Sequence, residues 1–288
     1  MPPVPRPPQS DEIILGDNLD VLPGFAGESF QLIYIDPPFN TGRAQRRRTL
    51  VTTPDPAGDR TGFQGRRYRT RLLAESSYRD AFDAYLEFLE PRLIEAHRLL
   101  QGSGTLYFHI DYREAHYCKL LLDEVFGRRN FLNEIIWAYD FGARARGRWP
   151  TKHDTILVYV KDIASYHFDA EAVDREPYMA PGLVTPEKAA RGKLPTDVWW
   201  HTIVATNGRE KTGYPTQKPE GIVRRMVLAS SRPGDWCLDF FAGSGTLGAV
   251  AAREGRHYVL VDSSAEACHV MGRRLGLPVS AAGCAPRG

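Results

Sequence analysis

Four consecutive residues, Asp36-Pro37-Pro38-Phe39, carry groups suited to chemistry on an amine. The Pro37 carbonyl is not required for a hydrogen bond within a sheet, because Pro38 has no backbone donor. Together with the Asp36 carboxylate it can offer two acceptors to an exocyclic –NH₂. Two acceptors in tetrahedral geometry free the nitrogen lone pair and stabilise developing positive charge. Phe39 offers a face on which an extruded base could stack. The alternative is a Pro-Pro stop at the end of a strand.

A glycine-rich turn, Gly243-Ser244-Gly245-Thr246-Leu247-Gly248, matches G-x-G-x-x-G between a predicted strand and a predicted helix. Asp262 ends the next predicted strand, about 20 residues further on, where a carboxylate suits ribose hydroxyls. The pattern indicates a nucleoside cofactor without saying which one. A tight β–α turn that needs glycine is the alternative. Too few residues follow Asp262 to complete a nucleotide-binding sheet, so the missing strands must come from the N-terminal side.

The elements that must position these residues alternate between short apolar runs and helical periods. Strands are predicted at residues 12–15, 30–35, 105–110, 135–137, 155–160, 237–241 and 258–261. Helical segments are predicted at 19–25, 80–100, 113–125, 221–231 and 247–253. This alternation favours an α/β fold with a mostly parallel sheet and helices on both faces. Residues 41–71 have no such period and are expected to form one long loop.

Composition excludes several protein classes. The chain has 288 residues, of which 42% are hydrophobic and 25% charged, as in globular proteins rather than disordered or fibrous ones. No apolar run could span a membrane, and the proline-rich start lacks the apolar core of a signal peptide. The four cysteines lie far apart without a Cys-x-x-Cys pair, which suits a reduced cytosolic protein. The histidines show no metal-ligand spacing, so no metal is expected.

Positive charge is concentrated locally, although the formal net charge is only +2. Residues 41–71 contain nine arginines and two aspartates, and a second basic bend follows at 142–152. Arginine forks suit phosphates and guanine edges, so we expect these segments to contact DNA, with a solvated loop as the alternative. The residues expected to bind DNA are Arg43, Arg46, Arg47, Arg48, Arg144, Arg146 and Arg148.

These motifs, in this order, resemble the S-adenosylmethionine-dependent amino-DNA methyltransferases of the β class, in which an Asp-Pro-Pro-Tyr/Phe tetrapeptide precedes the glycine loop. Further matching segments are Gly16-Asp17-Asn18-Leu19-Asp20, Phe126-Gly127, Tyr214-Pro215-Thr216-Gln217-Lys218-Pro219 and Asp239-Phe240-Phe241-Ala242. The resemblance covers about residues 11–275. It implies a circularly permuted Rossmann-like methyltransferase sheet with an inserted target-recognition region, in a cytoplasmic, nucleoid-associated enzyme.

The resemblance also implies a division of the chain. We expect a disordered leader at 1–10, a catalytic half at 11–160, a target-recognition region at 161–213, a cofactor-binding half at 214–275 and a tail at 276–288. It assigns catalysis and base stacking to Asp36, Pro37, Pro38 and Phe39. The expected cofactor-binding residues are Asp17, Lys218, Asp239, Phe241, Ala242, Gly243, Gly245, Thr246 and Asp262. Among these, Asp17 would serve the adenine, Asp262 the ribose and Lys218 the carboxylate. Without the resemblance, Lys218 would be interpreted as a solvated lysine in a loop.

The implied function is site-specific methylation of the exocyclic amine of a flipped base in double-stranded DNA. The aspartate at position 36 favours adenine N6, and cytosine N4 is the alternative. There are two more distant alternatives. The glycine turn alone would also fit an NAD-dependent oxidoreductase, and the chain could be a non-catalytic DNA-binding module. Protein or RNA substrates stay open, as do a homodimer and a cognate restriction enzyme.

Overall fold

The computed structural model describes residues 5–40, 45–54, 57, 60–61, 67–78, 84–142, 145–205 and 207–282. The chain divides into two compact units. The larger unit combines Met1–Pro37 with Leu86–Gly288, and the smaller unit is Pro38–Tyr85.

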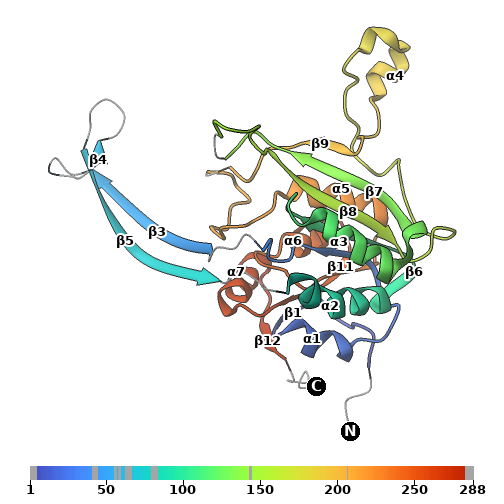
Figure 1. Ribbon diagram of the computed structural model, residues 1–288, viewed down its shortest axis with the longest axis horizontal. Helices are drawn as coiled ribbons and strands as arrows, with labels where there is room; N and C mark the ends of the chain where they lie inside the picture. Colours follow the sequence, from blue (N-terminus) through green and yellow to red (C-terminus); the bar gives the residue numbers. More distant parts are fainter. Residues whose placement is uncertain are drawn as a thin grey trace. The chain divides into compact units, whose positions relative to one another are not determined.

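A nine-stranded sheet forms the centre of the larger unit, in the order β12-β1-β11-β10-β2-β6-β8-β7-β9 (Figure 1). The strands are β1 Glu12–Leu15, β2 Phe30–Ile35, β6 Leu100–Ile110, β7 Phe131–Ala138, β8 His153–Val160, β9 Val198–Trp200, β10 Trp236–Asp239, β11 His257–Asp262 and β12 Val279–Ala281. Neighbours from β12 to β6 run parallel. Strand β8 is antiparallel to both β6 and β7, and β9 is parallel to β7. The prediction of a mostly parallel α/β sheet is confirmed.

Helices cover both faces of this sheet, with α2 and α3 on one face and α5 and α6 on the other (Figure 1). The helices are α1 Asn18–Val21, α2 Tyr85–Leu99, α3 Ala115–Leu122, α4 Pro186–Arg191, α5 Glu220–Ser230, α6 Thr246–Arg253 and α7 Ala265–Leu275. Strand β2, with the sequence Phe-Gln-Leu-Ile-Tyr-Ile, is buried at all six positions. Alternate side chains of a strand point to opposite faces, so such a strand needs a covered sheet.

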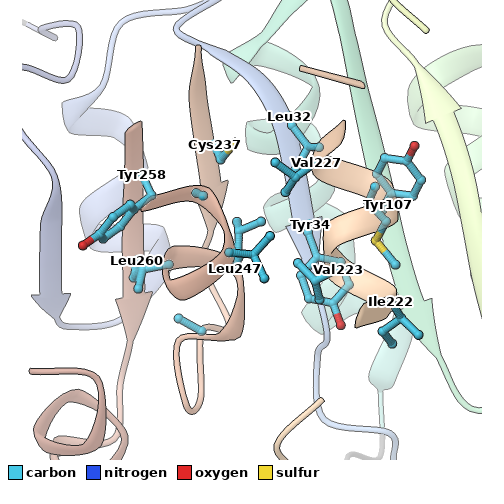
Figure 2. Packing of buried hydrophobic residues seen from close by; sticks show 14 of the residues in the cluster. Leu32, Tyr34, Tyr107, Ile222, Val223, Val227, Cys237, Leu247, Tyr258 and Leu260 are labelled. Carbon is cyan, nitrogen blue, oxygen red and sulfur yellow. The ribbon is translucent and has the colours of Figure 1, made fainter. Parts of the chain in front are cut away.

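The core between the sheet and helices α5 and α6 is shown in Figure 2. Val223 and Val227 of α5 pack with Leu32 and Tyr34 of β2, and Leu247 begins the contact of α6 with the same layer. All of these side chains are buried. Burial of this apolar layer fixes the positions of β2 and β10 in the sheet, and therefore the position of the edge at which their carboxyl ends lie.

Strands β2 and β10 are neighbours, and the connections that follow them lead to opposite sides of the sheet. From β10 the chain passes through α6 to β11 on one side, whereas β2 leads to β6 on the other side. Such a switch point opens a crevice at the carboxyl ends of the strands, where open α/β sheets bind ligands. Asp36 follows β2 directly, and Asp239 ends β10.

Several elements of the larger unit were absent from the sequence predictions or differ from them. Strand β9, helix α7 and strand β12 were not predicted, and β12 lies in the segment expected to be a tail. The leader is not wholly disordered: the Arg6 amide donates to the Gly24 carbonyl over 3.0 Å, and the Ala26 amide donates to the Arg6 carbonyl over 2.9 Å. These two bonds hold the leader to the turn after α1, so residues near Arg6 have a backbone partner that composition does not reveal.

The smaller unit is an antiparallel hairpin, and the expectation of one loop over 41–71 is wrong. Strand β3, Gln45–Pro54, pairs with β5, Arg67–Tyr78, and the short β4, Arg60–Thr61, pairs with β5. A register shift at Thr49/Leu50 marks an irregularity in the ladder. Threonine, valine and leucine follow one another within β3, and their preference for strands outweighs the arginines around them. The glycines and prolines that suggested a loop lie mainly between the strands.

Within the described ranges, no helix is long and apolar enough to cross a membrane. In the same part of the chain, no group of three or more His, Cys, Asp or Glu residues could hold a metal ion. Cys118, Cys237 and Cys268 are free thiols buried in the fold, and Cys284 lies outside the described residues.

Candidate functional site

Asp36 and Lys218 meet at the carboxyl edge of the sheet. The Lys218 Nζ donates to Asp36 Oδ2 over 2.5 Å, and the two side chains are only 11% (Lys218) and 16% (Asp36) exposed. The other carboxylate oxygen, Asp36 Oδ1, is buried and accepts no hydrogen bond from the described residues. A buried acceptor without a donor is costly, which is typical of an atom kept for a ligand. Asp36 therefore presents one occupied and one available oxygen.

The rest of the tetrapeptide is divided between the two units. Pro37 ends a segment of the larger unit, whereas Pro38 and Phe39 belong to the smaller unit. In the smaller unit, the Tyr85 hydroxyl donates to the Pro38 carbonyl over 2.6 Å. Asn40 adopts a positive φ of 52°, which an asparagine tolerates better than most residues.

The glycine turn between β10 and α6 has the conformation that its glycines allow. Gly243 and Gly245 have φ angles of 50° and 71°, a region that disfavours residues with a Cβ. A Cβ on Gly245 would also lie 2.9 Å from Met271 Cγ. The Asp262 carboxylate fixes the turn, accepting from the Gly243 amide and the Ser264 amide, both over 2.8 Å. Burial raises the pKa of Asp262, and the two amides work against that rise.

Asp239 lies at the end of β10 and is 3% exposed. Its Oδ1 accepts from the Phe241 amide over 3.0 Å. Burial raises the pKa of Asp239 well above its usual value, the charges of Asp36 and Asp262 raise it further, and Lys218 opposes the rise. The carboxyl groups of Asp36 and Asp239 therefore both lie within the electrostatic reach of the Lys218 ammonium group at this edge.

The raised pKa of Asp239 predicts a pH-dependent effect of Asp239→Asn. The folded-state pKa lies above the unfolded value of about 4, so ionisation costs stability increasingly as pH rises above about 4. Asparagine removes that cost and can still accept from the Phe241 amide. We expect the variant to melt above the wild type at pH 8, with an advantage that shrinks toward pH 5. Each unit of pKa shift corresponds to about 1.4 kcal/mol.

Thermal melting of both proteins from pH 5 to pH 8 measures this effect. Glu134→Gln, which neutralises an exposed acid on β7, provides the matched control and should show no such trend. A difference in melting temperature that is the same at every pH would contradict the assignment of the cost to ionisation.

The turn after β1 is joined to the turn after β10 by a buried asparagine. Asn18 Nδ2 donates to the Phe240 carbonyl over 2.9 Å, and Asn18 Oδ1 accepts from Arg92 Nε over 2.7 Å. Arg92 also pairs with Asp17 over 3.3 Å, while Asp17 caps α1 by accepting from the Leu19 amide. Burial lowers the pKa of Arg92, and Asp17 offsets part of that effect. Asp17 was predicted from the sequence, but its partners Asn18 and Arg92 were not.

Aromatic rings extend from this junction toward the glycine turn. The Arg92 guanidinium lies 3.8 Å from the centroid of the Phe88 ring. The rings of Phe88 and Phe241 are 6.1 Å apart, and those of Phe240 and Phe241 are 5.3 Å apart. Arg92 had no signal in the sequence, because a single arginine on an amphipathic helix is usually solvated. Its burial follows only from the position of α2 beside the turn.

A second buried network connects three strands behind Asp36. The ring of His109 on β6 is fully buried, with Nδ1 3.0 Å from the Tyr34 hydroxyl and Nε2 3.2 Å from Asp154 Oδ2. Tyr139 donates to Asp154 Oδ1 over 3.1 Å. Burial raises the pKa of Tyr34, which keeps its phenol protonated. Burial opposes ionisation of Asp154, but the bond with His109 and the charge of Lys218 hold its pKa below the usual value.

A pocket of about 530 Å³ lies beside this network. Its walls include Trp137, Tyr139, Phe141, Asp154, Tyr214 and Lys218. Aromatic faces with one carboxylate, Asp154, and two ammonium groups, Lys211 and Lys218, suit a flat, polar-edged ligand. Because Lys218 both lines the pocket and contacts Asp36, the pocket adjoins this carboxylate.

Every cofactor-binding residue expected from the sequence lies in the larger unit. Asp239 and Asp262 end β10 and β11, Thr246 begins α6, Asp17 follows β1, Lys218 precedes α5, and the others lie on the turn between β10 and α6. The expected DNA contacts are more scattered. Arg46, Arg47 and Arg48 belong to strand β3 of the smaller unit, whereas Arg146 and Arg148 are exposed on the bend of the larger unit. Arg148 donates to the Tyr112 hydroxyl over 3.1 Å and thereby lowers the pKa of Tyr112. Arg43 and Arg144 lie outside the described residues.

Comparison with known proteins gives a consistent result. The model of the N6/N4 DNA methylase family matches residues 30–273. The chain is 30% identical over 275 residues to the DNA adenine methyltransferase YhdJ of Escherichia coli K12, covering 93% of this chain and 83% of that protein. It is also 30% identical over 264 residues to the type II methyltransferase M.HpaI of Haemophilus parainfluenzae, covering 91% of this chain and 73% of that protein.

The fold is also that of solved proteins. TTHA0409 of Thermus thermophilus, described as a DNA modification methylase and solved with S-adenosyl-L-methionine, superposes with a TM-score of 0.59. The two sequences are 20% identical, and the match covers 96% of this chain and all of that one.

Proposed function

Because the chain belongs to the family of N6/N4 DNA methylases, we propose that it methylates the N6 amine of adenine within a specific DNA sequence. The observation that carries this proposal is the Asp36 carboxylate at the end of β2, with one buried oxygen available to an N–H donor. Aspartate at this position and the similarity to a relative named as an adenine methyltransferase favour adenine over cytosine.

The chemistry proposed for this edge needs two acceptors. Asp36 Oδ1 and the Pro37 carbonyl would each accept a hydrogen bond from one N–H group of the target amine and hold its nitrogen in tetrahedral geometry. The negative charge of Asp36 stabilises the nitrogen as it becomes positive, and the carboxylate is placed to take the proton that the nitrogen gives up. Phe39, which follows in the chain, is proposed as the stacking face for the base.

S-adenosylmethionine is the proposed cofactor, and it would supply an electrophilic methyl group. The residues at the switch point fit its parts. Each oxygen of the Asp262 carboxylate accepts one hydrogen bond, from the Gly243 amide or the Ser264 amide. Each oxygen has a second lone pair, which can accept a hydrogen bond from a ribose hydroxyl. Phe241 offers an apolar face and Lys218 a cation, which suit a thioether chain that ends in a carboxylate. The bound cofactor of the Thermus protein, which has the same fold, supports this choice.

The target base is proposed to enter the pocket between Trp137, Tyr139 and Tyr214, since this pocket adjoins Asp36 through Lys218. We propose residues 161–213, with α4 and β9, as the target-recognition region between a catalytic half (11–160) and a cofactor-binding half (214–275). The exposed bend at 145–152, with Arg146, Arg148 and a Trp149 side chain that is 93% exposed, would contact DNA beside this region.

Sequencing for modified bases in DNA from cells that express the protein, followed by mass spectrometry of the nucleosides, tests this function. We expect N6-methyladenine in one sequence context. N4-methylcytosine as the sole product would overturn the adenine assignment, but it would not change the family to which the chain belongs. Calorimetry with S-adenosylmethionine and NAD tests the cofactor separately, and binding of NAD alone would overturn it.

The hairpin is proposed as a DNA-binding arm, and the triple variant Arg46→Ala, Arg47→Ala, Arg48→Ala tests it. Removing phosphate contacts lowers affinity most at low salt and makes the dependence on salt less steep, by about 0.9 per lost contact in a plot of log K against log salt concentration. We expect weaker DNA binding with unchanged cofactor binding. Fluorescence anisotropy across a salt series measures the slope, and an unchanged slope would remove β3 from the DNA interface.

A further inference from the structure

Lys218 connects the glycine turn to the carboxylate of Asp36. Its backbone carbonyl accepts from Thr246 Oγ1 over 3.1 Å, at the first residue of α6. Its side chain extends to Asp36 Oδ2 at 2.5 Å. One residue therefore contacts both the turn proposed to hold the cofactor and the group proposed to hold the target amine.

The backbone around Lys218 is held in place, so the side chain is the part that can move. The neighbouring Gln217 accepts from the amide and the hydroxyl of Thr212, both over 2.8 Å, and donates to the Glu210 carbonyl over 2.6 Å. These bonds brace the loop that carries Lys218. A lysine has a flexible four-carbon stem and three rotatable donors, and it can therefore change partners without moving its backbone.

The ammonium group of Lys218 has several carboxylates within its electrostatic reach. It contacts Asp36, it helps to hold the pKa of Asp154 down, and it opposes the rise of the pKa of Asp239. Its pairing with Asp36 has a chemical consequence. A cation on Oδ2 offsets the negative charge with which Asp36 would stabilise a positively charged nitrogen. The observed pair is thus suited to the free enzyme and unsuited to methyl transfer.

We propose that Lys218 is a positioning residue that exchanges Asp36 for the carboxylate of the bound cofactor, so that Asp36 receives the target amine only when the cofactor is present. The proposal rests on the cofactor assigned above. In the free protein Asp36 competes with the cofactor carboxylate for one ammonium group. Occupation of the cofactor site and capture of the amine are then positively coupled, and the coupling is reciprocal.

Calorimetry of two ligands tests this competition without catalysis. S-adenosylhomocysteine carries the carboxylate but no transferable methyl group, whereas 5′-methylthioadenosine is a nucleoside thioether that lacks the amino-acid part. We expect Asp36→Asn to bind S-adenosylhomocysteine about five- to tenfold more tightly than the wild type, a coupling of ordinary size. Its affinity for methylthioadenosine should not change, because that ligand does not need Lys218.

A Lys218→Met variant completes the cycle. It should bind S-adenosylhomocysteine about tenfold more weakly, and adding Asp36→Asn in that background should give no gain. Glu134→Gln, which removes one negative charge from an exposed position, should leave both affinities unchanged. The melting temperature of each variant without ligand checks that it is folded.

Three results would overturn the proposal: no gain in Asp36→Asn, an equal gain for both ligands, or the same gain with and without Lys218. An equal gain would indicate only the loss of a nearby negative charge. If the wild type binds S-adenosylhomocysteine and the gain is missing, the exchange of partners fails and the proposed function stands. If the wild type binds neither ligand, the cofactor assignment fails first and the exchange fails with it.

Discussion

Asp36→Asn is expected to lower the rate of methyl transfer to DNA by about a thousandfold, as loss of a charge-stabilising group at a reacting centre typically does. The amide keeps the shape of the carboxylate but not its charge, and it cannot take the proton from the nitrogen. The substitution leaves no cavity, so the variant should remain folded, but loss of the carboxylate paired with Lys218 should lower its stability.

Transfer of labelled methyl groups to DNA in a single turnover measures this rate. Glu134→Gln controls for the loss of one charge, since this residue is exposed on β7. Calorimetry with S-adenosylhomocysteine separates lost chemistry from lost folding, because the variant should still bind that ligand. A rate within about threefold of the wild type would remove Asp36 from the catalytic role.

The second large effect concerns stability. His109→Ala is expected to lower the free energy of unfolding by about 3–5 kcal/mol. The substitution leaves a cavity in the buried core of the sheet, and it deprives both the Tyr34 hydroxyl and Asp154 Oδ2 of their His109 partner. Because its lowered pKa keeps Asp154 ionised, a buried negative charge loses one of its hydrogen bonds.

Urea denaturation of His109→Ala and of His116→Ala measures this difference. His116 is exposed on α3, so its loss should cost less than about 0.5 kcal/mol. A cost below about 1 kcal/mol for His109→Ala would show that the network contributes little, and that the ring serves only to fill space.

The sequence reveals those parts of the site that are local in the chain. The apolar run before Asp36 and the glycines at 243 and 245 each predict their own structure, because a strand, its proline stop and a turn with positive φ depend on adjacent residues. Asp262 could be expected for the same reason, as the end of the next apolar run. In a parallel sheet, these local patterns are enough to place the carboxyl ends of three strands at one edge.

The missed residues have partners far away in the chain. Asn18 contacts Phe240 across 222 residues, and His109 contacts Tyr34 and Asp154 across 75 and 45 residues. Such contacts depend on the order of strands in the sheet, which no local pattern encodes. His109 was interpreted as packing at the end of a strand, which describes its burial but not its two polar partners. The hairpin was missed for a different reason, since charge and glycine content obscured its runs of β-branched residues.

The order of strands also has a consequence for synthesis on the ribosome. Strand β1 lies between β11 and β12, and β2 lies between β6 and β10, so two strands made early wait for partners made near the end. A nascent chain carries Asp36 for most of its synthesis without the strand that will border it. The site therefore assembles only after translation has passed residue 262, and a prematurely terminated chain would expose the apolar edges of β1 and β2 to aggregation.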